Sequence, residues 1–338
     1  MRYSRVVLSG LGYELAPNVV SSAELEKRIE PVYRALRFPL GQLEALTGIR
    51  ERRWWDPGFK LADGAARAGR KALAQAGMKA SDLGALVYAG VCRDGSEPAT
   101  ACAVASALGA GRDCAVYDLS NACLGVLSGI VDVANRIELG QIKAGLVVSC
   151  ESAREINDSM IASMIAKPTI EHFKLSIATL TGGSGAAAAL LTEGSFGGAG
   201  PRLLGGTAQA APEHWDLCRW ERDFMRTDAA AVLKNGVELA RGTWKSFLAN
   251  LGWETRDVDK VICHQVGGPH RAAVLKAFGV GEEKDYSTYE HLGNIGTVSL
   301  PLTAALADER GFLNEGDRVG FLGIGSGLNC LMLGWEWR

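Results

Sequence analysis

Strand-like apolar runs alternate with helical patterns along the first 150 residues of the sequence. The strand-like runs are residues 5–8, 83–92, 115–119 and 144–150. The helical patterns between them are residues 63–77, 100–108 and 123–139. Buried parallel strands are typically continuous apolar runs, and joining two of them requires a crossover that is usually helical. The alternation therefore predicts the α/β class with a largely parallel sheet.

Two segments of this region recur about half a chain later. Ser81–Gly90 is similar to Arg256–Gln265 at an offset of 175 positions, and Leu139–Ser149 is similar to Glu315–Ile324 at nearly the same offset. Each segment is a polar turn followed by a buried strand, and this combination is common enough that a single match could arise by chance. Two matches at almost one offset instead favour a duplicated βαβ unit.

The duplication predicts two halves, residues 1–200 and residues 201–338. The segment at about residues 152–180 has no counterpart in the second half, where a compact glycine-rich turn follows the matching strand. We therefore interpret it as an insertion in the N-terminal half, placed to cap an apolar site.

The composition excludes several classes of protein. The chain has 36 basic and 38 acidic residues and a formal charge of −2, so it lacks the basic patch that nucleic acid requires as a partner. No apolar run approaches the ~18 residues of a membrane span, and the N-terminus lacks the apolar core of a signal peptide. The eight cysteines include no C-x-x-C pair, which argues against a zinc site or a disulfide framework. We expect a cytoplasmic protein without a metal.

Cys123 lies where a predicted strand gives way to a predicted helix, within Asp118–Gly129. A thiol at a helix N-terminus experiences the positive end of the helix dipole, which lowers its pKa and favours the nucleophilic thiolate. Open α/β sheets also bind ligands at the carboxyl ends of their strands. Cys123 is thus a candidate nucleophile, although most cysteines in such a chain are simply buried thiols.

His264 and Asn294 are the candidate partners of this thiol. His264 ends the duplicated strand, directly before a glycine-rich loop, where an imidazole can donate a proton to a reacting thioester or accept one. Asn294 lies between glycines ahead of a helical run, and its amide could donate to an oxyanion. Each residue could equally be structural, and His270 and His291 compete with His264 for a catalytic role.

The segment Phe321–Asn329 contains the glycine-rich turn Gly-Ile-Gly-Ser-Gly. It superficially resembles a dinucleotide-binding fingerprint, which requires a helix after the glycines. The following residues, Cys330–Trp337, are strand-like, so this pattern argues against a nicotinamide cofactor.

Taken together, Cys123, His264, Asn294 and the glycine turn resemble the Cys-His-Asn condensing enzymes of the thiolase superfamily. The segment Thr47–Arg53 is similar to the T-G-I-x-x-R-R signature of the ketoacyl synthase III group. The resemblance implies a five-layer αβαβα fold built from two pseudo-equivalent halves and assembled as a homodimer. It also implies a Cys123 nucleophile, with His264 and Asn294 polarising the thioester of a second substrate.

The same resemblance implies binding sites around this centre. The backbone N–H groups of Cys123 and of the Gly325–Ser326 turn would hold the acyl oxyanion. Arg50, Arg53 and Trp54 would lie near the tunnel mouth and contact coenzyme A, whose phosphates arginine binds well. Coenzyme A enters as part of the substrate, and no further cofactor is expected.

Glu97 departs from the pattern of synthases that decarboxylate a malonyl extender, because those enzymes form their carbanion by losing CO₂. An enzyme that joins two plain acyl thioesters must remove an α-proton, which suits a desolvated glutamate with a raised pKa. The sequence is similar in this respect to the head-to-head acyl-CoA condensing enzymes of bacterial olefin biosynthesis, in which such a glutamate enters the partner subunit's active site. In the structural alternative, Ser96 caps a helix whose first turn contains Glu97 and Pro98.

We therefore expect a non-decarboxylating Claisen condensation of two long-chain fatty acyl-CoA molecules, giving a 2-alkyl-3-keto acid or thioester. Three alternatives stay open at this point. The chain could be a decarboxylating 3-ketoacyl synthase III that uses malonyl thioesters, a cysteine-dependent acyl thioesterase, or a non-catalytic binding protein that keeps the fold.

Overall fold

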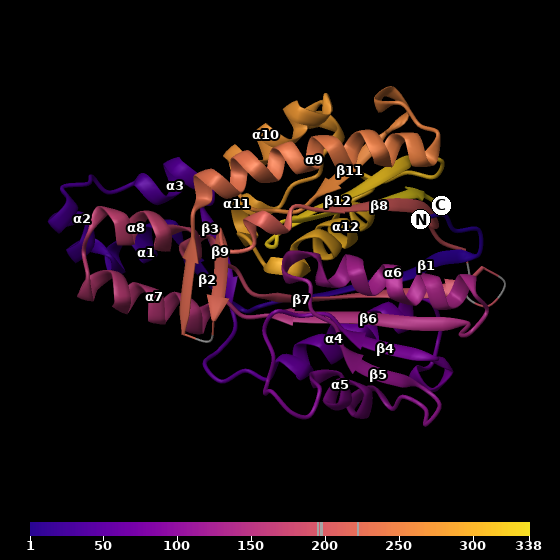
Figure 1. Cartoon of the computed structure of the whole chain (residues 1–338). Helices are drawn as coiled ribbons and strands as arrows, with labels where there is room; N and C mark the ends of the chain where they lie inside the picture. The colour runs from indigo at the N-terminus through magenta and orange to yellow at the C-terminus, as the bar shows by residue number, and fades with distance from the viewer. Residues whose placement is uncertain (195, 197–198, 222) are drawn as a thin grey trace.

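The computed structural model describes residues 1–194, 196, 199–221 and 223–338. Nine strands form one continuous sheet in the order β11-β12-β13-β8-β1-β7-β6-β4-β5 (Figure 1). These strands are β1 (Val6–Leu15), β4 (Ala85–Tyr88), β5 (Ala115–Asp118), β6 (Ala144–Glu151), β7 (Gly185–Glu193), β8 (Arg202–Ala210), β11 (Lys260–Cys263), β12 (Arg318–Gly325) and β13 (Asn329–Glu336). Two small antiparallel pairs are β2 (Asn18–Ser21) with β3 (Glu51–Trp54) and β9 (Cys218–Glu221) with β10 (Phe224–Thr227).

The helices fall into those that cover the sheet and those that form a lobe at one end of it. Helices against the sheet are α4 (Leu61–Gln75), α5 (Thr100–Leu108), α6 (Gly125–Glu138), α9 (Ala229–Leu251), α10 (Gly268–Phe278) and α12 (Ser299–Glu309). Those outside it are α1 (Ser22–Arg28), α2 (Glu30–Leu36), α3 (Gln42–Thr47), α7 (Arg154–Ala166), α8 (Ile170–Ser176) and the short α11 (Tyr289–Leu292). None of the helices among the described residues combines the length and apolar character needed to cross a bilayer.

The strand pairings repeat between the two halves. In the N-terminal half β7 pairs antiparallel with β1 and β6, and β4 pairs parallel with β6. In the C-terminal half β13 pairs antiparallel with β8 and β12, and β11 pairs parallel with β12. In the C-terminal half, an isolated parallel bridge between Val261 and Asp285 corresponds to the parallel β4–β5 pairing of the N-terminal half. The segments matched in the sequence contain β4 and β11, and β6 and β12, so the predicted duplication is confirmed.

Alternate residues of each strand enter different core clusters, which gives five layers. On β4, Leu86 faces α4 and α5 while Val87 faces the centre; on β12, Leu322 faces α9 and α10 while Phe321 faces the centre. Helices α6 and α12 fill the central layer between the two halves of the sheet (Figure 1). The α/β class and the αβαβα layering are thus as predicted, and the period of two in strands explains how each strand serves two cores. The prediction of a largely parallel sheet is wrong, because only the β4–β5, β4–β6 and β11–β12 pairs are parallel and the other five neighbouring pairs are antiparallel.

Strand β1 is longer than the predicted run of residues 5–8 because it continues through two glycines. A Cβ at Gly10 would lie 2.2 Å from the Ala72 carbonyl oxygen, and a Cβ at Gly12 would lie 2.0 Å from that of Ala68. The glycines therefore allow α4 to pack directly on the strand. A run broken by glycines does not look like a strand in the sequence, which is why the prediction stopped early.

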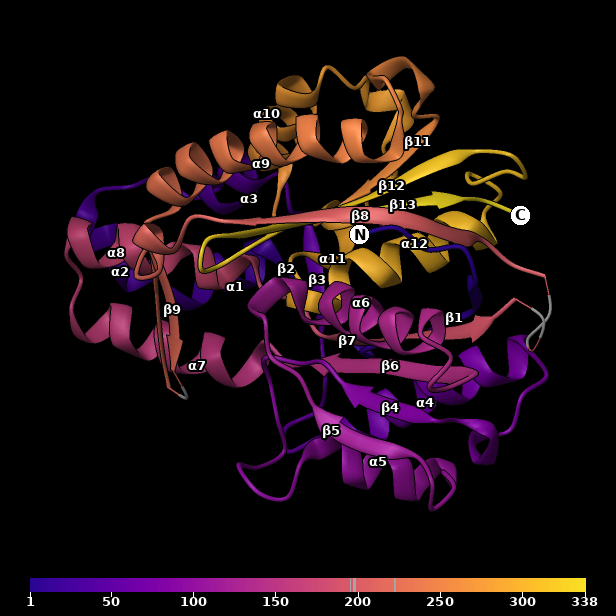
Figure 2. The same cartoon turned by 45° about the vertical axis from the view of Figure 1, so that its right-hand side comes forward.

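The predicted insertion at residues 152–180 consists of α7, α8 and the 3₁₀ turn η3 (Ile177–Thr181). Together with α1–α3 and the β9–β10 hairpin it forms the lobe beside the sheet (Figure 2). Apolar residues from these elements share one core, including Tyr33, Met164 and Phe173. The division predicted after residue 200 lies between β7 and β8 and stays a prediction.

Candidate active site

Cys123 lies in the 3₁₀ turn η2 (Ala122–Leu124) between β5 and α6. Ala122 has a φ of +44°, an uncommon conformation for a residue with a side chain, so the chain turns sharply just before the thiol. A Cβ at Gly125 would lie 2.5 Å from the carbonyl oxygen of Ala89, so only glycine lets α6 begin this close to the end of β4. The turn thus presents Cys123 at the carboxyl ends of the parallel strands.

The predicted effect of the helix on the Cys123 thiol is wrong. Burial raises the pKa of Cys123 to about 12, and the nearby Cys218 and Glu151 side chains act in the same direction. Helix α6 begins only at Gly125, and its dipole does not offset the loss of solvent around the sulfur. In the free site Cys123 is therefore a thiol, which must lose its proton as it attacks a substrate.

The glycine-rich turn after β12 faces this sulfur. The backbone N–H groups of Ser326 and of Cys123 itself are directed at the Cys123 Sγ, where they partly oppose the rise in its pKa. A Cβ at Gly325 would lie only 3.5 Å from the Cys123 nitrogen, so the two turns touch. The two N–H groups predicted to hold the oxyanion are therefore directed at the sulfur that would carry the acyl group. The segment after the glycines is β13, so the strand predicted there is confirmed.

His264 follows β11, and its backbone N–H donates to the Leu322 carbonyl of β12 at 2.9 Å. This places it one strand from the turn that contacts Cys123. Burial lowers the pKa of His264 to about 3, and neighbouring His270 adds to the effect. Its Nδ1 is buried and has no hydrogen-bond partner among the described residues. A neutral imidazole of this kind is suited to donating a hydrogen bond, and unsuited to serving as a base at neutral pH.

The histidines should make the fold sensitive to acid. Burial lowers the pKa of His270 to about 4, and both values lie below the ordinary 6.5, so unfolding takes up protons below about pH 6.5. Stability is then complete above that pH and falls as the pH drops. Each group contributes about 2 kcal/mol of the loss between pH 7 and pH 5. We expect His264→Asn and His270→Asn each to reduce that loss by about this amount in urea unfolding. A loss equal to that of the wild type would contradict the assignment.

Asn294 is held by backbone contacts on both sides. Its N–H donates to the Thr181 carbonyl and its carbonyl accepts from Gly183, each at 2.9 Å, while its Oδ1 accepts from the Gly296 N–H at 3.0 Å. With Oδ1 engaged, the amide NH₂ is the group that remains for a ligand. The turn η7 (Gly296–Val298) then contacts the Cys123 region, where the Thr297 Oγ1 accepts from the Val126 N–H at 2.7 Å.

Glu97 lies in the loop of residues 91–99, between β4 and α5, and is exposed in the single subunit. The structural alternative for it is wrong. Helix α5 begins at Thr100, and the carboxylate that accepts its first N–H groups belongs to Asp118, at 3.0 Å from Thr100 and 2.9 Å from Ala101. Glu97 and Pro98 precede this helix, and Ser96 does not cap it. The predicted desolvation of Glu97 is not present in one subunit and would need a second one.

Glu151, at the end of β6, is a site residue that the sequence reasoning missed. It is only 3% exposed, and its carboxylate accepts the N–H groups of Val91 and Cys92 at 2.8 and 3.0 Å. Burial raises its pKa to about 7, against these two hydrogen bonds, which act to lower it. A Cβ at Gly296 would lie 3.6 Å from its carboxyl carbon. An acid that ends an apolar strand was the available signal, since other site residues also follow strands.

The predicted coenzyme A contacts differ in their exposure. Arg50 is exposed, with its Nε 3.9 Å from Glu44. Arg53 is half-buried and donates to the Ala16 carbonyl at 3.2 Å. Trp54 is 2% exposed, and its indole N–H donates to the Gly182 carbonyl at 3.1 Å. Trp54 therefore packs inside the lobe core instead of lying at a tunnel mouth, while substrate contact by the two arginines stays a prediction.

No cluster of three potential metal ligands occurs among the residues that the structure describes. All eight cysteines are free thiols.

Comparison with known proteins identifies close relatives of the whole chain. Residues 248–337 match the family model of the 3-oxoacyl-[acyl-carrier-protein] synthase III C-terminal region. The chain is 59% identical to an acyl-CoA:acyl-CoA alkyltransferase of Shewanella oneidensis and 36% identical to one of Xanthomonas campestris, with 100% of each chain covered in both cases. A beta-ketoacyl-[acyl-carrier-protein] synthase III of Oceanobacillus iheyensis is 28% identical over 97% of both chains.

Solved structures give the same result. A crystal structure of Xanthomonas campestris OleA matches with a TM-score of 0.97, covering 100% of this chain and 98% of that one. Another, with bound lauric acid and lauroyl-CoA, matches with a TM-score of 0.96 over 99% and 100% of the two chains. Structures of that protein carry substitutions of one glutamate, one cysteine and one histidine. Its glutamate precedes its cysteine by 26 positions, as Glu97 precedes Cys123 here, and its histidine follows by 142, against 141 for His264.

Proposed function

This chain belongs to the acyl-CoA:acyl-CoA alkyltransferase family of thiolase-superfamily condensing enzymes, and we propose that it joins two long-chain fatty acyl-CoA molecules by a non-decarboxylating Claisen condensation. The observation that carries the proposal is the 59% identity to such an alkyltransferase over both full lengths. The structure of the Xanthomonas campestris protein with bound lauroyl-CoA supports a fatty acyl-CoA as the substrate. No cofactor beyond the coenzyme A of the substrates is needed.

In the first half-reaction the Cys123 sulfur attacks the thioester carbonyl of one acyl-CoA. The bond to the coenzyme A sulfur breaks, and the thiol proton of Cys123 ends on the departing coenzyme A. The N–H groups of Cys123 and Ser326, already directed at this sulfur, are positioned to stabilise the oxyanion of the tetrahedral intermediate. Covalent attachment divides a difficult transfer into two easier steps.

In the second half-reaction the Glu97 carboxylate removes an α-proton from a second acyl-CoA. His264, neutral at physiological pH, and the Asn294 amide donate hydrogen bonds to the enolate oxygen. The α-carbon attacks the acyl carbonyl, a carbon–carbon bond forms, and the bond to Cys123 breaks as the sulfur regains a proton. The product is a 2-alkyl-3-ketoacyl-CoA, which leaves as the thioester or, after hydrolysis, as the acid.

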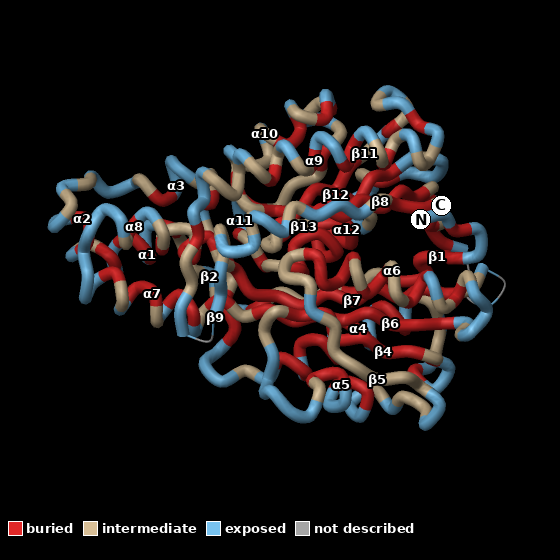
Figure 3. Tube along the Cα trace, viewed as in Figure 1, coloured by how far each residue is buried: buried red, intermediate tan, exposed pale blue. Residues whose placement is uncertain are grey.

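Glu97 can act in this way only if another surface desolvates it, so we propose a homodimer in which it enters the partner's site. Residues 93–98 are all exposed in one subunit, so this loop is available to a partner. Strand β5 is the edge of the nine-stranded sheet and only half-buried (Figure 3). An unpaired edge of this kind is usually covered, and a second copy of the chain would cover it.

Two further assignments follow from chemistry. We place the enzyme in the cytoplasm, where a reducing environment keeps thiols free, as all eight cysteines are here. A two-chain keto product suits a route that later removes its oxygens, so we propose a role in olefin biosynthesis.

The proposal is tested by supplying myristoyl-CoA alone and then with carboxyl-labelled malonyl-CoA. We expect coenzyme A release and a two-chain keto product from myristoyl-CoA alone, with no labelled CO₂ in the second reaction. A strict requirement for malonyl-CoA would identify a decarboxylating synthase instead. Myristic acid as the sole product would identify a thioesterase.

A further inference from the structure

We propose that Glu151 and Asp118 are positioning residues for Glu97, because their carboxylates hold the two ends of the loop that contains it. The inference rests on the proposed function, since it concerns the base of that reaction. The loop comprises residues 91–99 and is called the base loop below.

Glu151 holds the first end of the base loop. One carboxylate oxygen accepts from the Val91 N–H at 2.8 Å, and the other accepts from the Cys92 N–H at 3.0 Å. Because β6 and β4 are paired side by side, Glu151 is fixed to the sheet directly beside the strand from which the loop departs. Two bonds to consecutive N–H groups set both the position and the direction in which the chain leaves the sheet.

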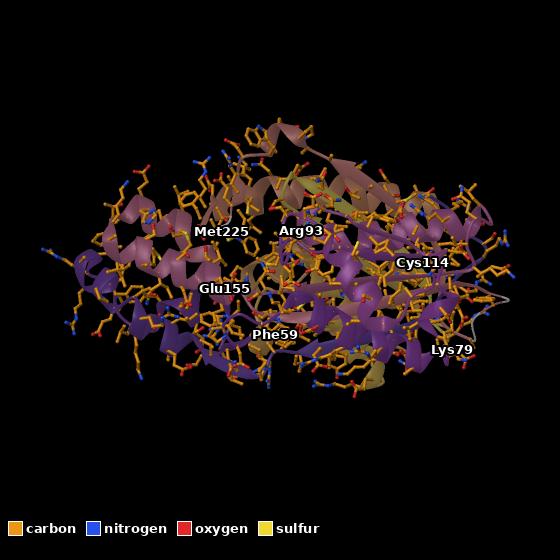
Figure 4. The ribbon with its side chains drawn as sticks, turned by 90° about the horizontal axis from the view of Figure 1, so that it is seen from below. Phe59, Lys79, Arg93, Cys114, Glu155 and Met225 are labelled. Atoms are coloured by element: carbon orange, nitrogen blue, oxygen red, sulfur yellow. The ribbon has the colours of Figure 1, made fainter. Side chains whose placement is uncertain are left out.

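Asp118 holds the second end, at the start of α5. Its two oxygens accept from the Thr100 and Ala101 N–H groups at 3.0 and 2.9 Å. An oxygen of the Asp118 carboxylate also lies 3.7 Å from the Nε of Arg93, which is labelled in Figure 4. This ion pair connects the first part of the loop to the end of β5. In turn Asp94 of the loop accepts from the Leu61 and Ala62 N–H groups of α4, at 2.8 and 2.9 Å.

Between these anchors the loop is exposed from Arg93 to Pro98. The position of Glu97 relative to the subunit is therefore determined by Glu151 and Asp118 at the two ends of the loop, together with the contact of Asp94 with α4. A displacement of about 1 Å at a reacting group can cost about a hundredfold in rate, so the anchors matter for proton transfer.

Glu151 also lies near its own subunit's nucleophile, which makes its role separable by experiment. Its carboxylate raises the pKa of Cys123, and it packs beside Gly296, two residues after Asn294. The other groups that face it are Cys92 and Arg93 from the base loop, Tyr88 from β4 and Cys150 from its own strand. If Glu97 enters the partner's site, Glu151 affects two active sites: it affects the partner's site by positioning the base loop, and its own subunit's site by its proximity to Cys123.

Mixed dimers made with two affinity tags distinguish these routes. One chain carries Cys123→Ala, so the single working site uses Cys123 of the other chain and Glu97 of the Cys123→Ala chain. Glu151→Gln is then placed in either chain, and the measured quantity is condensation product per acyl-enzyme formed. We expect about a hundredfold loss when Glu151→Gln is in the Cys123→Ala chain, and a much smaller loss of this ratio when it is in the other chain. Equal ratios in both arrangements, or the reverse pattern, would overturn the proposal.

Glu97→Ala in the same two arrangements is the matched control. Glu97→Ala should abolish condensation when it is placed in the Cys123→Ala chain, and should have no effect when it is placed in the other chain. The opposite result would refute the crossing of Glu97 into the partner's site, and this inference with it. The expected Glu97 pattern without the Glu151 pattern would refute the inference alone.

A second variant covers the case in which Glu151→Gln does not yield a folded dimer. Asp118→Asn removes one acceptor at the other end of the base loop and should give the same dependence on which chain carries it. If Asp118→Asn lowers the ratio in both arrangements equally, or in neither, the base loop is not positioned by its anchors and the proposal is wrong.

Discussion

Replacing Glu97 with Gln is expected to lower condensation by about 10²- to 10⁴-fold, the usual contribution of a general base, while acyl transfer to Cys123 stays near the wild-type rate. Gln has the size and hydrogen-bonding shape of Glu but cannot accept the α-proton of the second acyl-CoA. The first half-reaction breaks no carbon–hydrogen bond, so it does not need the carboxylate. Because Glu97 is exposed in the single subunit, the variant should fold normally.

The two half-reactions are separated by rapid mixing with myristoyl-CoA. An initial burst of coenzyme A reports acylation, and the later rate of keto product reports condensation. Glu315→Gln, on the surface after α12, is the matched control and should behave as the wild type. Equal loss of burst and product in Glu97→Gln would mean that the side chain is structural.

Replacing Cys123 with Ala is expected to abolish both half-reactions, lowering coenzyme A release on the order of 10⁴-fold or more. Cys123 carries the sulfur at which the Ser326 N–H is directed, so neither transfer nor condensation should proceed without it. The change removes a single sulfur atom, and circular dichroism should show an intact fold. Cys102→Ala, at an exposed position on α5, is the control and should retain activity. Unchanged activity in Cys123→Ala would favour a non-catalytic protein.

The fold was predictable where the hydrophobic pattern of a segment matches the burial of that segment in the structure. Strands β4 and β6 are buried by helices on both faces, and β5 pairs with β4 at the edge of the sheet. Their continuous apolar runs were therefore enough to predict them as strands. The repeat offset predicted the duplication because the matched segments form equivalent strands of the two halves.

The site was predictable in its residue types and less so in its electrostatics. Cys123 and His264 follow strands, and Asn294 lies between glycines ahead of a helix, all positions that a sequence reveals. The pKa of Cys123 depends on how completely the three-dimensional packing removes water, which outweighs the helix dipole and has no local sequence signal. Glu151 was missed for the same reason, because its bonds to Val91 and Cys92 join residues 60 and 59 positions apart. The proposed placement of Glu97 in a partner's site involves a contact between two subunits, which a pattern within one chain does not reveal.

The most direct test of the division of labour between Cys123 and Glu97 is the mass of the intact Glu97→Gln chain after mixing with myristoyl-CoA. The account predicts that one myristoyl group accumulates per chain, that peptide mapping locates it on Cys123, and that keto product forms at least about a hundredfold more slowly than in the wild type. An unmodified chain, or an acyl group on Cys123 that turns over to keto product at the wild-type rate, would contradict it.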